Sequence, residues 1–420
     1  MYCPFCGQNI QVTFQYCPCC GNHLQGFRNA EEQIPGGDDT CDELIAHYFR
    51  EGFAYEKIMQ FLGKFHGINI SLRTLNTKLR SLGLRRRNKE YDLSLIRQRI
   101  QHELDGPGSS AGYRSVWHTL QREGYQVPRE TIRVFVNELD PDGVRERQGK
   151  TLRRRTYHNP GPNYAWHVDG YDKLKPYGFP VHGCIDGYRR KVLWLKVCKT
   201  NNNPAVTSQH FLDAVKKYGG CPTLLRTDKD NGTENVIMAA MQAYFRTSGD
   251  DEMAGINAHR YGCSQSNQRI ESWWAFLRKN RSNWWMNFFK DMIETGHLNT
   301  SSDLDKECLW YCFANLLQED LTSVKRNWNS HYIRKSRFDT VAGRPDELYF
   351  LPECNGAQNY AKQVTDAQFQ DMSQYCHEYM EENVIQEYYC TIGNELGMSQ
   401  PTHWRRALEM YHILRGIAQS

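Results

Sequence analysis

The sequence lacks a long hydrophobic run and a recognisable export signal. No segment approaches the about 20 consecutive apolar residues that a membrane-spanning helix requires. The first residues, MYCPFCGQNI, have neither a basic start nor an apolar stretch, so we expect no secretory signal and no membrane partner. We therefore expect a reducing compartment, in which a framework of disulfide bonds is not favoured.

The sequence also has little excess charge of one sign. Its net charge of +4 over 420 residues does not by itself indicate nucleic-acid binding. The distribution is more informative, because two short segments are strongly basic, and each is either a solvated face or a DNA contact. The first cluster is Arg80, Arg85, Arg86, Arg87 and Lys89, and the second is Arg145, Arg147, Lys150, Arg153, Arg154 and Arg155.

Cysteine is the residue type whose distribution is most uneven. Five of the 15 cysteines lie in residues 1–26, in the strings CPFCG and CPCCG. Two such C-x-x-C knuckles supply four thiolates for a tetrahedral zinc ion, so we expect a zinc ribbon here, as a closed structural site that need not contact any ligand. Cys19 is surplus, because leaving it out gives both knuckles the same spacing. The expected zinc ligands are Cys3, Cys6, Cys17 and Cys20.

Two helical modules are expected after the zinc ribbon, over residues 40–88 and 90–148. In the first, apolar residues recur at spacings of three and four, which predicts three helices, with Ser71 as the N-cap of the third. Such a unit with the basic exit GLRRRNK is typical of a helix-turn-helix, although an ordinary packing or dimerisation unit is the alternative. The second module repeats the pattern, with Pro128 at a helix start. The DNA contacts expected from these modules and from the second basic segment are Arg73, Arg85, Arg86, Arg87, Arg153, Arg154 and Arg155.

After residue 159 the sequence pattern changes from helical to strand-like. The strings AWHVDG, FPVHGCIDG, RKVLWLKVC and PTLLRTD are β-like, and a helix over 204–218 separates the last two. This order predicts an α/β sheet with antiparallel hairpins and a crossover, as in an RNase H-like domain, over 160–352. Residues 353–420 are expected to form a helical C-terminal region. The chain is thus a multidomain protein with an α/β core and all-α modules.

Acidic residues at the ends of these strands carry the predicted chemistry. Phosphodiester cleavage at neutral pH requires charge neutralisation on the attacking and leaving oxygens, which two divalent ions about 4 Å apart provide. Asp169 ends a short apolar strand, and a helix could bring Glu271 back across the sheet edge. Between them, LLRTDKDNGTEN offers Asp228 and Asp230. Strand phasing favours Asp228 and loop spacing favours Asp230, so both stay open.

The region from about 161 to 352 resembles the integrase core of retroviral-type integrases and related transposon-derived eukaryotic transposases. The resemblance rests on GPNYAWHVDGYDKLKPYGFPVHGCIDGYRRKVLWL, on GTEN at 232–235, on SNQRIESWW at 266–274, and on NSHYIRKSR with GRPDELY. It implies that Asp169 is the first catalytic acid and Glu271 the third. The family pattern D-x-G-x-E-N fits from Asp230, whereas the preceding strand ends at Asp228.

The resemblance also implies an activity and its partners. We expect metal-dependent DNA strand cleavage and strand transfer with two Mg²⁺ or Mn²⁺ ions, on double-stranded DNA, by a homo-oligomer in the nucleus. Arg269 and Lys279, which flank Glu271, are expected to hold phosphates. The alternative is a domesticated DNA-binding protein that kept the fold without catalysis, and a hydrolase acting on RNA is a weaker one.

Several other polar residues have simpler interpretations. Asp186 precedes a glycine and is expected in a turn, and Glu234 is expected to hydrogen-bond its loop. His167 and His182 are expected on strand faces rather than as bases, because a metal-bound oxygen is already activated. Trp274, like its neighbouring tryptophans, is expected in a core or an interface.

Overall fold

The structure of the protein is a computed structural model. No helix in the part of the chain that it describes combines the length and apolar character needed to cross a membrane. The residues it describes are 40–86, 91–109, 111–141, 143–144, 159–228, 234–248, 251–262, 267–334, 341–377 and 383–419.

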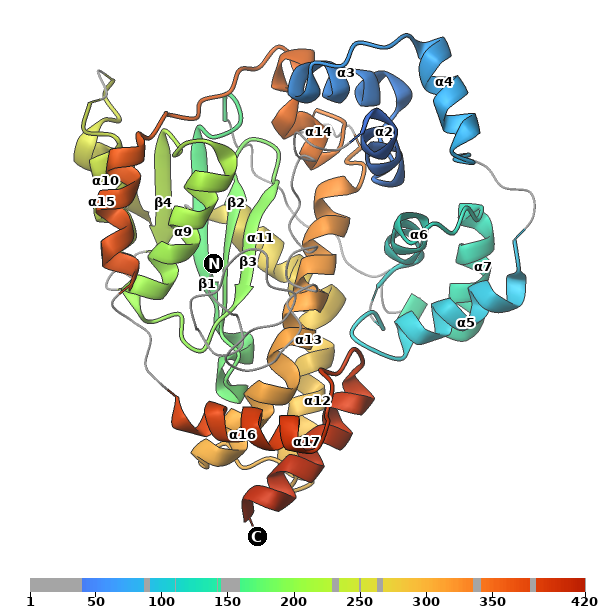
Figure 1. Ribbon diagram of the computed structural model, residues 1–420, viewed down its shortest axis with the longest axis vertical. Helices are drawn as coiled ribbons and strands as arrows, with labels where there is room; N and C mark the ends of the chain where they lie inside the picture. The colour runs from blue at the N-terminus through green and yellow to red at the C-terminus, as the bar shows by residue number, and fades with distance from the viewer. Residues whose placement is uncertain are drawn as a thin grey trace.

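A five-stranded mixed sheet forms the centre of the molecule (Figure 1). Its order is β3-β2-β1-β4-β5, in which β1 pairs antiparallel with β2 and parallel with β4. This is the RNase H-like order, so the predicted sheet with hairpins and a crossover is confirmed. The strands are β1 Ala165–Tyr171, β2 Val181–Asp186, β3 Val192–Val197, β4 Leu224–Asp228 and β5 His259–Gly262.

Helices cover both faces of the sheet, because alternate strand residues point to opposite sides. Trp166 and Val168 of β1 pack into an apolar cluster with helices α9 and α10. Tyr171 belongs to the opposite cluster, which holds α11, α12 and α13. Asp169 precedes Tyr171 by two residues and therefore faces α11. These helices are α9 Pro204–Tyr218, α10 Val236–Phe245, α11 Gln268–Leu277, α12 Asn283–Glu294 and α13 Asp303–Ser330, with a π-helical turn, η3 Arg278–Ser282, between α11 and α12.

Side-chain amides of α13 satisfy the backbone of the edge strand β3. The amide N–H of Val197 donates to Gln318 Oε1 at 2.9 Å, and Gln318 Nε2 donates to the Leu195 carbonyl at 3.1 Å. Asn329 accepts from the Val192 N–H at 2.8 Å and donates to its carbonyl at 2.9 Å. The edge is thereby covered by a helix, which is one way that native sheets avoid pairing with another chain.

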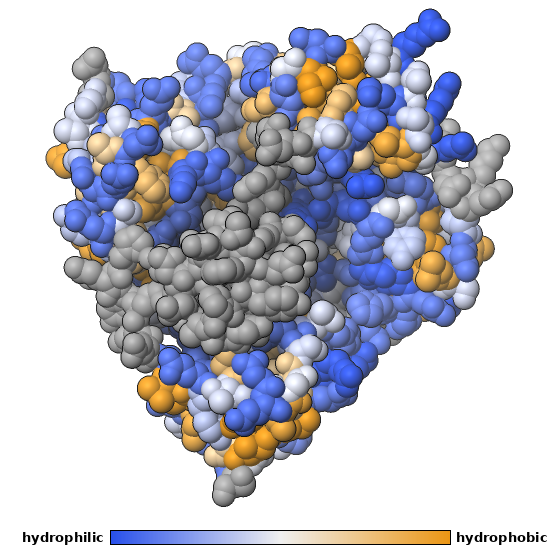
Figure 2. Space-filling model, viewed as in Figure 1, coloured by the Kyte–Doolittle hydropathy of each residue, from blue (hydrophilic) through white to orange (hydrophobic). Residues whose placement is uncertain are grey.

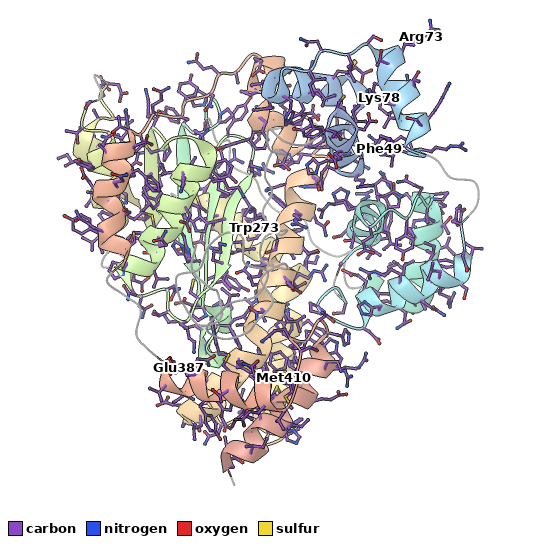
Figure 3. The ribbon with its side chains drawn as sticks, viewed as in Figure 1. Phe49, Arg73, Lys78, Trp273, Glu387 and Met410 are labelled. Carbon is purple, nitrogen blue, oxygen red and sulfur yellow. The ribbon has the colours of Figure 1, made fainter. Side chains whose placement is uncertain are left out.

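The first helical module consists of three helices around its own apolar cluster. Thr40 and Glu43 form a capping box at its start, and Ser71 accepts from the Thr74 N–H at 3.1 Å as the predicted N-cap. Arg73 extends from the outer end of the third helix (Figure 3). The helices are α2 Cys41–Arg50, α3 Tyr55–His66 and α4 Leu72–Ser81.

The second module also has three helices and a separate cluster. Pro128 is the residue before its last helix, in agreement with the predicted helix start. The cluster contains Ile96, Ile100, Val116, Leu120, Ile132 and Val136. The helices are α5 Leu93–Leu104, α6 Tyr113–Arg122 and α7 Arg129–Leu139.

Arg344 attaches the first module to the core. Its guanidinium donates to the carbonyls of Glu51 at 3.0 Å, Gly52 at 2.6 Å and Ser330. Gly52 has φ +82°, a backbone conformation that other residues rarely adopt, and a Cβ there would lie 3.0 Å from the same guanidinium. Both the backbone conformation and the lack of space therefore disfavour a larger residue. Arg344 precedes helix α14 Pro345–Phe350, which is followed by a 3-10 turn, η4 Pro352–Asn355.

Buried polar groups attach the second module to α13 and η3. Arg281 donates to Glu103 of α5 at 2.5 Å, and both of these side chains are less than 10% exposed. The Arg281 guanidinium also lies 3.6 Å from Asp320 of α13. His118 Nε2 lies 2.9 Å from Ser330 Oγ. The module is thus joined to the core by desolvated charges and not only by apolar packing.

The C-terminal region is helical, as predicted. Its first helix packs on α9 and α10, and its last packs along α13 (Figure 1). Hydrophobic residues gather over α16 and α17 at the lower end of the molecule (Figure 2), where Val384 is 72% and Ile413 50% exposed. The helices are α15 Asp366–His377, α16 Val384–Glu395 and α17 Trp404–Gln419.

Candidate active site

Two of the predicted acids lie on neighbouring parallel strands. The last recorded pair between β1 and β4 joins His167 to Arg226. Asp169 and Asp228 each lie two residues further along, so they are level with each other and, by the alternation of strand residues, point to the same face. Both are buried, at 7% and 6% exposure. The sheet therefore brings these carboxyl groups together without any contribution from a loop.

The third acid, Glu271, lies on helix α11, which packs against this face of the sheet. Asn267, at its N-cap, donates from Nδ2 to the Val168 carbonyl at 3.0 Å, and its Oδ1 lies 2.7 Å from His167 Nδ1. Trp274 donates from Nε1 to Asp169 Oδ2 at 2.9 Å. Glu271 follows Asn267 by four residues and precedes Trp274 by three, so all three share one face of the helix. That face is directed at β1.

Space for Trp274 depends on a glycine opposite the first acid. Gly183 of β2 pairs directly with Asp169, and a Cβ at Gly183 would lie 2.7 Å from the Trp274 ring. Tyr171, at the end of β1, stacks at a tilt on Trp274 with 5.1 Å between ring centroids. Its hydroxyl lies 2.5 Å from Ser282 Oγ in η3. Both ends of the segment carrying Glu271 are therefore tied to β1.

The three carboxyl groups interact electrostatically. Burial, reinforced by repulsion from Glu271 and Asp228, raises the pKa of Asp169 to about 7, and the hydrogen bond from Trp274 opposes this rise. Burial and the charge of Asp228 also raise the pKa of Glu271 above its usual range. Mutual repulsion of this kind disfavours three anions in one place unless a cation accompanies them.

The donor chemistry fits a hard divalent cation. Mg²⁺ and Mn²⁺ take carboxylate oxygens and retain several waters, so three acids suffice. Within the described residues, however, no group of three His, Cys, Asp or Glu side chains is gathered closely enough to hold one ion. The three acids are electrostatic neighbours and do not form a closed cage. Asp230 lies outside the described residues.

Comparison with known families agrees with this geometry. Residues 156–353 match the family model of the integrase core domain. This part of the chain is an integrase core domain. Such domains belong to integrase- and transposase-type DNA transesterification enzymes, which are typically DDE polynucleotidyl transferases and generally use divalent metals. A search of curated proteins found no match. The matched region agrees with the region from 161 to 352 that the sequence motifs predicted.

Two of the basic residues near Glu271 have partners within the protein. Arg269 is half-buried and lies near Asp186, where its charge partly offsets the rise that burial causes in the pKa of that carboxyl. The charge of Arg269 also contributes to the low pKa of His167, after burial as the main cause, and its phosphate contact stays a prediction. Arg281 is buried against Glu103, as described above. Lys279 is exposed, and its phosphate contact stays a prediction.

The basic residues of the first module also differ in whether they are exposed or have partners within the protein. Arg73 and Arg85 are exposed. The guanidinium of Arg86 instead lies 3.8 Å above the Phe49 ring and donates to the carbonyls of Phe49, at 2.9 Å, and Phe53. These donors close the turn between α2 and α3, and a DNA contact at Arg86 stays a prediction. The predicted contacts Arg87, Arg153, Arg154 and Arg155 and the predicted zinc ligands Cys3, Cys6, Cys17 and Cys20 lie outside the described residues.

The simpler interpretations of the other polar residues agree with the structure. The Asp186 carboxylate accepts from the N–H of Tyr188 at 2.9 Å, as expected in a turn. His167 and His182 lie on strand faces, and burial lowers the pKa of each to about 3. At Glu234 the backbone carbonyl accepts from Thr207 at 2.7 Å, and the expected side-chain bond stays a prediction.

Sequence reasoning missed the residues that hold the acids in position. Trp274 was expected only in a core or an interface, yet its indole N–H bonds Asp169. Asn267 and Gly183 were not considered. The helical spacing of Asn267, Glu271 and Trp274 is a usable signal, because residues separated by three and four share a face. Nothing local marks Gly183.

Proposed function

We propose that the protein is a DNA integrase or transposase that cleaves DNA strands and transfers them with the help of two divalent cations. The observation that carries this proposal is the neighbourhood of Asp169, Asp228 and Glu271, which come from β1, β4 and α11. Bound Mg²⁺ or Mn²⁺ would activate the attacking water or 3′-hydroxyl and neutralise the leaving oxygen. The protein's part is to fix the donors and to exclude water from their buried side.

Asp169 is the central donor in this proposal. The Trp274 hydrogen bond to Oδ2 restricts the rotation of its carboxylate, so the carboxylate is held in position for a cation. Trp274 is therefore a positioning residue and not a catalytic one. Asn267 has the same role for Glu271, because it joins the start of α11 to Val168.

We assign the second acid to Asp228 in preference to Asp230. The assignment is supported by the level positions of Asp169 and Asp228 on paired strands and by the effect of the Asp228 charge on both other acids. A test compares Asp228→Asn with Asp230→Asn. Joining is expected to be lost in the first and retained in the second, and the reverse result would move the assignment to Asp230.

The other modules complete the proposal as DNA-binding and structural parts. We propose that the first helical module is a helix-turn-helix that binds duplex DNA, and that four thiolates in residues 1–26 hold a structural zinc ion. Two more expectations remain proposals, a homo-oligomer and a nuclear location. The exposed positions of Arg73 and Arg85 support the DNA-binding part.

The decisive experiment is strand transfer by the purified full chain. A duplex with a pre-cut 3′ end is incubated with target DNA and Mg²⁺ or Mn²⁺, and joined products are counted. Glu271→Gln is expected to lower joining at least about a hundredfold, since metal-assisted charge stabilisation supplies several kcal/mol and each 1.36 kcal/mol is a factor of ten. Glu294→Gln is the matched control, because Glu294 is an exposed acid paired with Lys290 on α12.

Each other outcome has a defined meaning. Tight DNA binding with no joining by the wild-type chain would support the non-catalytic alternative. Joining that Glu271→Gln leaves intact would refute the assigned acids. Cleavage of RNA without any activity on DNA would favour the hydrolase interpretation.

A further inference from the structure

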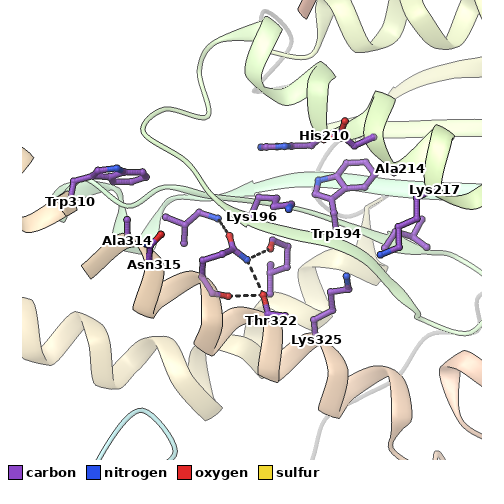
Figure 4. Close-up of a pocket in the computed structure, with 15 residues that line it drawn as sticks. Trp194, Lys196, His210, Ala214, Lys217, Trp310, Ala314, Asn315, Thr322 and Lys325 are labelled. Carbon is purple, nitrogen blue, oxygen red and sulfur yellow. Dashed lines mark hydrogen bonds between the residues drawn. The ribbon is translucent and has the colours of Figure 1, made fainter. Parts of the chain in front are cut away.

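A groove beside β3, the edge strand furthest from β4 and β5, is not used by the proposed chemistry. It lies between the edge strand β3 and helices α9 and α13, with a volume of about 360 Å³ (Figure 4). In the sheet order, β2 separates β3 from β1, so the groove is distinct from the three acids. A volume in this range is that of a small-molecule site and not of a protein interface.

The floor of the groove is fixed and already hydrogen-bonded. Gln318 bridges the backbone of Leu195 and Val197, and its Nε2 also lies 3.2 Å from Thr322 Oγ1. Figure 4 shows these bonds at the base of the groove. Because the amide is fully engaged, it orients the lining and leaves recognition to the other side chains. Trp194, which is only 4% exposed, forms an apolar wall.

Three lysines from three different elements border this space. Lys196 comes from β3, Lys217 from α9 and Lys325 from α13. In Figure 4 their side chains turn toward the same space beside Trp194. Asp213 lies four residues before Lys217 on α9 and is the one acid in the lining, so the lining has three positive charges against one negative charge.

Three lysines that line one groove favour the binding of an anion there. A concave, partly apolar surface strengthens the field of the charges that line it, and here the lining has an excess of positive charge. Lysine ammonium groups bind phosphate as point charges with three donors each, and flexible stems allow them to close around its oxygens. Half-buried stems reduce the conformational freedom that Lys196 and Lys325 lose on binding.

We propose that this groove binds a phosphate-bearing ligand, whose phosphate oxygens lie between Lys196, Lys217 and Lys325. The phosphate has two possible sources, a free polyphosphate anion or the phosphate groups of a nucleic-acid strand. The proposal does not depend on catalysis at Asp169, Asp228 and Glu271. An anion site at the β3 edge of the sheet adds to the proposed function without being part of it.

The test measures binding by the full chain with two probes. Inorganic tripolyphosphate is titrated by calorimetry at low salt, and a fluorescent single-stranded oligonucleotide is then used as a competitor. The groove variant is Lys196→Gln with Lys325→Gln, which removes two charges and keeps the stems' approximate length. The matched control is Lys216→Gln with Lys290→Gln, because both lysines are exposed and neither lines the groove.

The groove variant is expected to bind tripolyphosphate at least about tenfold more weakly than the wild type, since losing one charge-assisted hydrogen bond costs about 1.4 kcal/mol and that is a factor of ten. The control is expected to change affinity less than about twofold. Lys217→Gln is a second, milder variant with the same expected direction, and thermal unfolding of each variant checks that the chain remains folded.

The two sources give different results. Competition by the oligonucleotide that disappears in the groove variant would identify a nucleic-acid strand, and tripolyphosphate binding without competition would identify a free polyphosphate. Absence of binding by both probes, or equal weakening in groove and control variants, would overturn the proposal. Glu271→Gln is expected to leave tripolyphosphate binding unchanged, so failure of the proposed catalysis and failure of this site are separate results.

Discussion

The two three-helix modules have the same local architecture and differ in the use of their charges. Helix α4 of the first module, LRTLNTKLRS, has three basic residues and no acid. Helix α7, the corresponding last helix of the second module, has Arg129 and Arg133 together with Glu130 and Glu138. Arg133 donates to Glu130 at 2.9 Å and Arg97 to Glu138 at 2.7 Å. In the first module Lys78 is paired with Asp42 at 2.6 Å, and Arg73 and Arg80 remain exposed. The second module pairs Arg133 and Arg97 with acids.

The two modules also differ in the contacts that attach them to the core. The first module is attached through backbone carbonyls of the turn between α2 and α3 and through two ion pairs of α3, Lys57 with Glu347 and Lys64 with Glu353. Helix α4 is left at the outer corner (Figure 1). The second is attached through the buried ion pair of Glu103 on α5 with Arg281 and through the neutral His118 on α6, which lies 2.9 Å from Ser330 Oγ. We infer that the first module is the DNA reader and that the second is mainly a docking element. A repeated pattern in the sequence therefore does not imply a repeated function.

The largest expected effect is on the buried pair of the second module. Glu103→Gln removes the buried negative charge that pairs with Arg281 and Arg99, and Asp320 at 3.6 Å remains as the carboxylate near Arg281. We therefore expect the free energy of unfolding to fall by about 3 kcal/mol. Urea unfolding measures this loss. Glu138→Gln breaks an exposed pair and should cost less than about 1 kcal/mol. Equal losses in the two variants would show that the buried pair does not hold the module.

A pH-dependent effect is expected at the same interface. Burial, together with the nearby Arg344 and Arg122, lowers the pKa of His118 from its usual 6.5 to about 3 in the folded chain. Below pH 6.5 the unfolded chain binds the proton and the folded chain does not, so this residue lowers stability progressively as pH falls from 6.5 toward 3. Melting temperatures between pH 7 and 4 should fall less steeply for His118→Gln. An unchanged slope would contradict the buried neutral state.

A smaller effect should separate two neighbouring arginines of the first module. Arg86→Ala removes two hydrogen bonds to carbonyls and the contact with Phe49, so we expect a loss of about 2 kcal/mol in stability. Arg85→Ala, at an exposed position, should change stability by less than about 0.5 kcal/mol. DNA affinity should show the opposite order once folding is normalised. Stability of Arg86→Ala equal to that of the wild type would contradict the structural role of this guanidinium.

The smallest change concerns the salt dependence of DNA binding. Replacing Arg73 and Arg80 by alanine should reduce the slope of log affinity against log salt by about 2, because each phosphate contact contributes about 0.9. Replacing Arg129 and Arg133 should leave the slope nearly unchanged. A filter-binding series from 50 to 200 mM salt, in the range where such slopes are measured, compares the pairs. A larger reduction from the second pair would assign DNA reading to α7 instead.

The sequence by itself determined the local elements and the family. Helix 204–218, the N-cap at Ser71 and the turn at Asp186 were predicted and are present, because periodicity and capping depend on residues within a few positions. Asp169 and Glu271 were assigned from motifs in the same way. Only the choice between Asp228 and Asp230 depended on strand register, which the sequence left open.

Tertiary structure decided what surrounds these residues. The bond from Trp274 to Asp169 spans 105 residues of sequence and the pair of Arg281 with Glu103 spans 178. Gly183 opposite Asp169 and the three lysines around the β3 groove likewise come together only when strands and helices pack. Local spacing contains no information on which distant segment becomes a neighbour. The internal partners of Arg86, which was expected to contact DNA, therefore appear only in the folded chain.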